Sequence, residues 1–109
     1  MIYKFSKVYV YPEAVDMRSS FERLSHFIVD KLKRNLNEGD LFLFLGKNRR
    51  RLKILFFDGS GLLLVIKRME KNQFMNIAEL KEKKELSQAE LKLILHGSVL
   101  RKFYPDRAA

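Results

Sequence analysis

The chain has 109 residues, of which 47% are hydrophobic, and its two prolines and five glycines are too few breakers for a disordered protein. This length suits a single domain, which we expect to span residues 1–109. The sequence has no cysteine, which excludes disulfides and thiolate chemistry, and no apolar run approaches the roughly 18 residues of a membrane span. We therefore expect a soluble, cytoplasmic protein with no membrane partner.

The charge is strongly unbalanced, because 22 Lys and Arg against 13 Asp and Glu leave a formal net charge of +9. Most of the excess lies in residues 41–78, which hold eight bases and two acids. A surplus concentrated in one segment predicts a localised basic patch and an anionic partner, with a general role in solubility as the alternative.

The first part of the chain predicts a strand followed by a helix. Apolar and basic residues alternate over about the first ten positions, which indicates a strand that ends before Pro12. From Met17 onward the apolar residues recur at helical spacing, so we expect a helix over about 17–36. Asp16 is expected to cap its first turn, and Ser19 with Glu22 has the capping-box pattern.

The central segment predicts three antiparallel strands, LFLFL, RLKILFF and LLLVIKR, joined by turns at GKNRR and DGSG. The positive backbone φ angles of these turns are expected at their glycines and at the Asn and Asp beside them: Gly46, Asn48, Asp58, Gly59 and Gly61. A short fourth strand, QFMNI, follows at 73–77.

The C-terminal part predicts one further helix. Residues 79–86 are too polar to bury and are expected to form a solvated helical turn or a loop. Ser87 and Glu90 repeat the capping-box pattern before a helix over about 88–96, which Gly97 would end. The expected fold is therefore α+β, in the order β-α-β-β-β-α, with an antiparallel meander and both helices packed on one face.

The most informative feature is the basic hairpin around GKNRRRLK. If the DGSG turn pairs Phe57 with Leu62, then Arg51 stands opposite Arg68 and Lys53 opposite Ile66 on the same face. Like charges directly opposite each other are destabilising, so such positions either stay solvated, where they protect an edge from strand pairing, or bind an anion. Phosphate suits the forked donors of arginine.

Other candidate sites carry weaker signals. Strand aromatics such as Phe42 and Phe56 are suited to stacking unpaired bases, but a place in the core explains them as well. His26 and His96 lack a neighbouring nucleophile or carboxylate motif, and the basic segment holds only Asp58 and Glu70 as acids. We therefore expect no enzyme activity, no metal or other cofactor, and no small-molecule substrate, with a metal-free ribonuclease as a weaker alternative.

Three blocks of the chain resemble the small TnpB accessory protein, the second open-reading-frame product, of the IS-sixty-six family of bacterial insertion elements. They are DMRSSFERL at 16–24, LFLFLGKNRRRLKILFFDGSGLLLVIKRMEKNQF at 41–74 and AELKLILHG at 89–97. Two departures stand out. The family usually has a tryptophan near the DG turn, where this chain has Phe56 and Phe57, and the segment between Arg49 and Lys53 is entirely basic here.

The resemblance implies an accessory role in transposition beside the transposase and a second accessory protein, with no known catalytic step. From the residues we expect transposon DNA to contact Lys47, Asn48, Arg49, Arg50, Arg51, Lys53, Lys67 and Arg68. Matching the family motif adds three polar residues: Asp16, Arg18 and Asp58. The alternative is a module that docks on the transposase without touching DNA. Replacing Arg49, Arg50 and Arg51 with Ala is expected to abolish DNA binding and leave folding intact.

Overall fold

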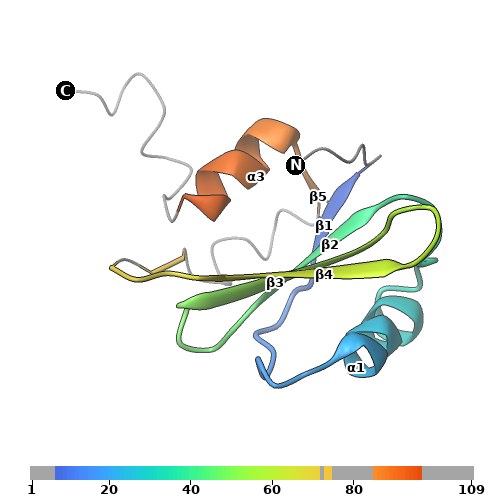
Figure 1. The fold of residues 1–109 in the computed structure, drawn as a ribbon, viewed down its shortest axis with the longest axis horizontal. Coiled ribbons are helices and arrows are strands. Elements are labelled where there is room, and N and C mark those ends of the chain that lie inside the picture. Colours follow the sequence, from blue (N-terminus) through green and yellow to red (C-terminus); the bar gives the residue numbers. More distant parts are fainter. Residues whose placement is uncertain (1–6, 72, 75–84, 97–109) are drawn as a thin grey trace.

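The structure is a computed structural model that describes residues 7–71, 73–74 and 85–96. One five-stranded sheet lies between helical segments (Figure 1). The strands are β1 Val8–Val10, β2 Leu41–Leu45, β3 Arg51–Phe57, β4 Leu62–Arg68 and β5 Glu85–Leu86. The helical segments are α1 Phe21–His26, the π-helical turn η1 Phe27–Lys31 and α3 Gln88–Leu95. The α+β class predicted from the sequence is confirmed.

The central meander has the predicted register. Strands β2, β3 and β4 pair antiparallel, and Phe57 lies opposite Leu62, as the DGSG turn requires. The same register places Arg51 opposite Arg68 and Lys53 opposite Ile66. The positions of the like charges therefore follow from the turn.

The sheet as a whole is mixed, in the order β4-β3-β2-β1-β5. β1 runs parallel to β2, with Tyr9 beside Phe42, because the chain crosses over through α1 before it returns as β2. β5 pairs antiparallel with the other edge of β1 and buries Leu86. The polar segment 79–86 therefore ends in a strand that we did not predict, although residues 79–84 lie outside the described part.

The two helices lie on opposite faces of the sheet, so the prediction that both pack on one face is wrong (Figure 1). Leu91 and Ile94 of α3 pack with Leu43 and Ile54, whereas Leu24 and Ile28 pack on the other face. The cause lies in the strands, since β1 and β2 are buried at every position and a sheet buried on both faces needs a layer on each side.

The first helix is shorter than predicted. The segment before Phe21 runs beside the sheet, where Val15 forms a bridge with Gly46. The predicted capping box at Ser19 and Glu22 does not form, and Asp16 does not cap the helix either: Ser20 is the N-cap residue, and its hydroxyl donates a hydrogen bond to Glu22. Among the residues before the helix, Met17 packs against the core and Ser19 is buried.

The second helix begins as predicted. The Ser87 hydroxyl accepts from the Glu90 N–H at 3.1 Å, and the Glu90 carboxylate accepts from the Ser87 N–H at 2.9 Å, which forms the capping box. Gly97, expected to end this helix, lies outside the described residues. Of the strand predicted at 73–77, Gln73 and Phe74 are not in a strand, and residues 75–77 lie outside the described residues. Among the described helical segments, none has the length and the apolar composition of a membrane span.

Candidate nucleic-acid interface

The turn between β2 and β3, residues 46–50, is the basic turn. Its Asn48 side chain accepts a hydrogen bond from the Arg50 N–H at 3.0 Å, and the Arg49 N–H donates to the Gly46 carbonyl at 3.2 Å. The positive φ angle falls on Arg49, at 61°, and not on Gly46 or Asn48 as predicted. This conformation costs a residue other than glycine roughly 1 kcal/mol, so the surrounding contacts must hold it.

Gly46 is needed for another reason. A Cβ added at this position would lie 2.7 Å from Met17 Cγ and 3.4 Å from the Arg51 carbonyl oxygen. The Val15 N–H also donates to the Leu45 carbonyl at 2.9 Å, which draws residues 15–17 against the end of β2. The missing side chain therefore lets the two segments approach each other.

The segment after β4 braces the basic turn. The Phe74 N–H donates to the Arg49 carbonyl at 2.6 Å, and the Gln73 side chain links the Asn48 carbonyl, at 2.9 Å, to Arg49 Nη2, at 3.1 Å. Phe74 is fully buried. Arg49 is half-buried by these contacts, so it holds the turn in place, and its replacement by Ala is no longer expected to leave folding intact.

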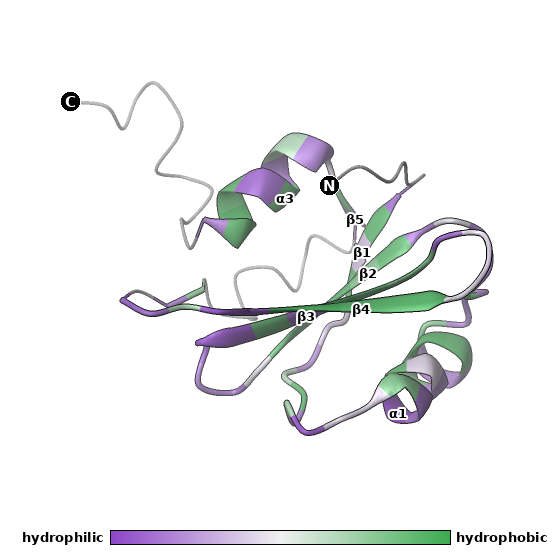
Figure 2. Ribbon diagram, viewed as in Figure 1, coloured by the Kyte–Doolittle hydropathy of each residue, from purple (hydrophilic) through white to green (hydrophobic). Residues whose placement is uncertain are grey.

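Four exposed cations gather at this end of the sheet, and we call them the basic cluster: Lys47, Arg50, Arg51 and Arg68. In Figure 2 the basic turn and the adjoining ends of β3 and β4 are hydrophilic, while most of the remaining length of these strands is hydrophobic. The Met69 N–H donates to the Arg50 carbonyl at 2.7 Å, which joins the two sides of the cluster. Lys71, two residues after Met69, is also exposed, and it was not among the residues predicted to contact DNA.

Arg51 and Arg68 are a close pair. Because the Met69 N–H bonds to the Arg50 carbonyl, alternation along an antiparallel ladder makes the next pair, Arg51 with Arg68, a non-hydrogen-bonded one. Side chains approach most closely at such pairs. Arg68 has Glu70 as an ion-pair partner at 2.9 Å, whereas no carboxylate of the described residues pairs with Arg51. An open cationic position results beside a second arginine.

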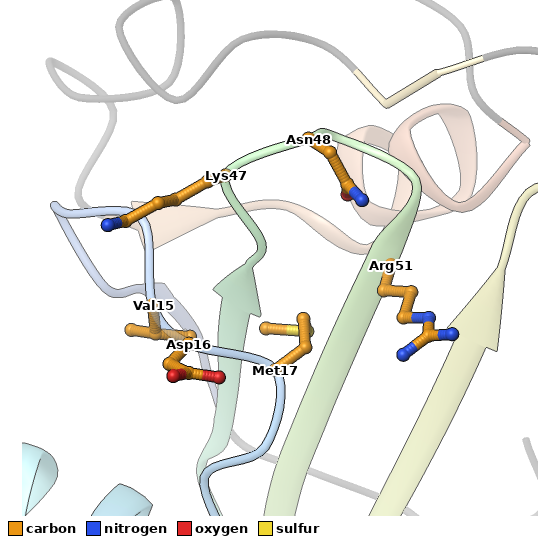
Figure 3. Close-up of a pocket in the computed structure, with 6 residues that line it drawn as sticks. All are labelled: Val15, Asp16, Met17, Lys47, Asn48 and Arg51. Atoms are coloured by element: carbon orange, nitrogen blue, oxygen red, sulfur yellow. The ribbon is translucent and has the colours of Figure 1, made fainter.

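The DMR segment meets the basic turn in an open pocket of about 250 Å³ (Figure 3). It is lined by Val15, Asp16, Met17, Lys47, Asn48 and Arg51. The Met17 side chain lies in this view between Asp16 and the Arg51 side chain, which extends from β3 toward β4 (Figure 3). Two family-like motifs about 30 positions apart therefore form one surface, which the sequence did not reveal because it depends on the Val15–Gly46 bridge.

Asp16 and Arg18 form a local ion pair at the rim of this pocket. The Arg18 guanidinium donates to the Asp16 carboxylate at 2.7 Å, and the Arg18 N–H does so at 2.8 Å. These hydrogen bonds, the side-chain ones first, hold the pKa of Asp16 well below its usual range. The Arg18 side chain remains 91% exposed. Asp16 thus stabilises its own loop and holds the Arg18 guanidinium beside the pocket.

Two lysines predicted to contact DNA instead donate hydrogen bonds to backbone carbonyls of the protein itself. Lys53 is only 6% exposed, and its Nζ donates to the Ser19 carbonyl at 2.7 Å. Lys67 is part-buried on the other face, where its Nζ donates to the Leu95 carbonyl at the C-terminal end of α3, a favourable place for a cation. The structure therefore keeps Lys53 and Lys67 out of the basic cluster.

Asp58 also lies apart from the cluster, in the β3–β4 turn at the opposite end of β3 (Figure 1). Its carboxylate accepts from the N–H groups of Ser60, at 2.9 Å, and Gly61, at 3.0 Å, and these bonds lower its pKa. Gly59 takes the positive φ of this turn, at 106°. Asp58 has a turn-forming role, and it is not brought together with Asp16 and Arg18.

Comparisons with known proteins place the chain in a family. Relatives include two proteins of Sinorhizobium fredii that are described as uncharacterized, y4hO at 33% and y4jC at 30% identity, each over 69 residues. Both alignments cover 63% of this chain, and they span 60% and 59% of the relatives' own lengths. No solved structure shows a significant match. The model of the family described as IS66 Orf2 like protein matches residues 6–104, and the chain therefore belongs to that family.

Proposed function

We propose that this protein binds the DNA of its insertion element through the phosphate backbone, as a non-catalytic subunit of the transposition machinery. Membership of the IS66 Orf2-like family implies an accessory role in insertion-element transposition. The proposal adds the direct partner, DNA, and the surface that contacts it, the basic cluster with Asn48 and the exposed Arg18 and Lys71 around it.

The observation that carries the proposal is the close pairing of Arg51 with Arg68. Two like charges across a non-hydrogen-bonded pair repel each other in the free protein, and a phosphate placed between the guanidinium groups turns that repulsion into attraction. Lys47 and Arg50 lie at the same end of the sheet and extend the favourable potential. The cluster is thus better suited to an anion than to bare solvent.

The kind of recognition follows from the same geometry. Phosphate contacts hold a protein on the duplex and carry little sequence information, so we expect similar affinity for element ends and for unrelated duplexes. Arginine can also donate two hydrogen bonds to a guanine edge if the basic turn enters the major groove. A higher affinity for the element end would reveal that second mode.

The test is a fluorescence-anisotropy titration of the full chain against a labelled element-end duplex and a scrambled duplex over a salt series. Binding should weaken steeply with salt, and R51A/R68A should bind at least about tenfold more weakly at low salt. Its slope of log affinity against log salt should be shallower by up to about 0.9 for each phosphate that the variant no longer neutralises. The matched control is K31A/K92A, which removes two exposed cations that do not belong to the cluster.

Two outcomes would contradict DNA binding through the basic cluster. If R51A/R68A and K31A/K92A bind alike, charge alone is responsible and the basic cluster has no special role. If neither duplex binds at low salt, the docking of the chain on the transposase becomes the better explanation of the +9 charge. Incubation of the protein with labelled RNA in the same buffers tests the ribonuclease alternative, because cleavage would overturn the non-catalytic assignment.

A further inference from the structure

The outer edge of β4 combines exposed apolar side chains with an open backbone edge. β4 is the last strand of the sheet, and among residues 7–71, 73–74 and 85–96 no strand pairs with its outer side. Its first five residues, 62–66, are all apolar, and Val65 and Ile66 are 41% and 57% exposed. A long apolar edge of this kind is a template for another strand.

The hydrogen bonds of the β3–β4 ladder show which groups face outward. The Asp58 N–H bonds to the Gly61 carbonyl at 3.0 Å, and the Met69 N–H bonds to the Arg50 carbonyl. By alternation, the odd-numbered residues of β4 direct their backbone groups toward β3. The N–H and C=O groups of Leu62, Leu64, Ile66 and Arg68 therefore point away from the sheet, and no other described strand pairs with them.

We propose that β4 pairs antiparallel with β4 of a second copy of this chain, with Val65 on the two-fold axis. Val65 is the midpoint of β4, so this register pairs all seven residues of the strand, and any other two-fold register leaves some unpaired. It sets Leu64 opposite Ile66 of the second copy, and the outward-facing groups of both strands meet in hydrogen-bonded pairs.

The distribution of charge favours this partner and this direction. In the antiparallel register Lys67 and Arg68 lie opposite Leu63 and Leu62, whose apolar surfaces their aliphatic stems can cover. The cationic end of each β4 also lies beside the turn that carries Asp58 in the other copy. Parallel pairing in register would set Lys67 against Lys67 and Arg68 against Arg68, which is destabilising.

Self-pairing stands independently of DNA binding, and only its consequence rests on the proposed function. The two basic clusters would lie at opposite ends of the shared strand pair, roughly 20 Å apart for seven residues of strand. A dimer would then hold DNA at two places, which raises its affinity beyond that of one cluster.

The experiment is analytical ultracentrifugation of the full-length wild type, V65K, V65E and an equal mixture of the two variants. We expect the wild type to dimerise in the micromolar range, and more strongly at higher salt, because salt screens the repulsion between two +9 chains. V65K and V65E should each be monomeric, since either places like charges on the axis. Their mixture should form a one-to-one heterodimer, because opposite charges then face each other.

The control is A89K, a lysine placed at an exposed apolar position in the first turn of α3, which follows β5 at the opposite edge of the sheet and should leave the dimer unchanged. A monomeric wild type at about 100 μM, a dimer that survives V65K, or a mixture that stays monomeric beside a dimeric wild type would each overturn the proposal. None of these results bears on DNA binding by the basic cluster, which the wild-type anisotropy titration measures separately. The wild-type result stands even if a variant fails to fold.

Discussion

Arg51 and Arg68 stand directly opposite each other at the ends of β3 and β4, in a non-hydrogen-bonded pair where side chains come closest. Arg68 is partly neutralised by Glu70, whereas no ion pair of the described residues involves Arg51. Repulsion within the pair slightly lowers the stability of the free protein, and the same two charges attract a phosphate strongly. Folding and binding should therefore respond in opposite directions to a change of charge at this position.

Charge reversal at Arg51 tests that opposition. R51E would place a carboxylate opposite Arg68, so the free energy of unfolding should rise by roughly 0.5 kcal/mol while DNA affinity falls more than tenfold. Urea unfolding and anisotropy titration measure the two effects. R50E, at an exposed position with no arginine across the strand pair, should weaken binding with little gain in stability. A loss of stability in R51E would show that the pair is not repulsive.

Gly46→Ala tests the close approach of the DMR segment to the basic turn. The new Cβ would meet Met17 Cγ at 2.7 Å, so the free energy of unfolding should fall by about 1–3 kcal/mol. Met17→Ala should cost less stability in the G46A background than in the wild type, because in G46A it also removes the clash. Gly61→Ala is the matched control, since nothing lies within 4 Å of its added Cβ. Equal effects of G46A and G61A in urea unfolding would refute the packing role of Gly46.

Arg49 tests the strain in the basic turn. R49A keeps the positive φ on a residue with a Cβ and loses the hydrogen bond to Gln73, whereas R49G loses the same bond but adopts this φ freely. R49A should therefore be less stable than R49G by about 1 kcal/mol in chemical denaturation. If the two variants unfold alike, the turn has relaxed and the strain is not retained in solution.

Lys53→Met separates structural from binding lysines. The change removes the buried Nζ and leaves the Ser19 carbonyl without its donor, so the free energy of unfolding should fall by roughly 1–3 kcal/mol. The salt slope of DNA binding should stay unchanged, because Lys53 is not in the basic cluster. Lys47→Met should do the reverse, with a shallower slope and ordinary stability. A reduced slope in K53M would return Lys53 to the DNA-binding surface.

The acid side of the stability profile should depend on Asp16 and Asp58. The pKa of each carboxyl is lowered in the folded protein, by hydrogen bonds from Arg18 and from the Ser60 and Gly61 N–H groups respectively. A carboxyl whose pKa is lowered on folding stabilises the folded protein at pH values above its pKa in the unfolded chain, near 4. This stabilisation is lost as the pH falls through the pKa of the folded protein. The melting temperature should therefore drop below about pH 4, and less so in D16N/D58N. Carboxyl ¹³C titration by NMR would show directly whether both pKa values are lowered.

Much of the meander was predictable from local pattern. The DGSG turn specifies the pairing of Phe57 with Leu62, and from that one pair every opposition along β3 and β4 follows, including Arg51 with Arg68. The capping box at Ser87 and Glu90 was equally local, since its partners are three residues apart. The family resemblance, which was drawn from three short blocks of sequence, was confirmed by the match of the family model to residues 6–104.

The failures share a different cause, which is dependence on contacts distant in sequence. The helix was predicted to begin near Met17, but Met17 packs against Gly46 and the helix begins only at Phe21. Continuous apolar runs in the strands indicate a sheet that is covered on both faces. They do not indicate which helix covers which face, and the structure places α1 and α3 on opposite ones.

The strand register, the concentration of positive charge near the basic turn and the family could all be inferred from the sequence, because each depends on neighbouring residues or on the turn that joins them. Which cations remain free depends on the folded chain. Lys53, which is buried, and Lys67, which is part-buried, donate to the backbone carbonyls of Ser19 and Leu95, far away in the chain. A buried cation must find such partners because desolvation is costly, and what it finds depends on the whole fold.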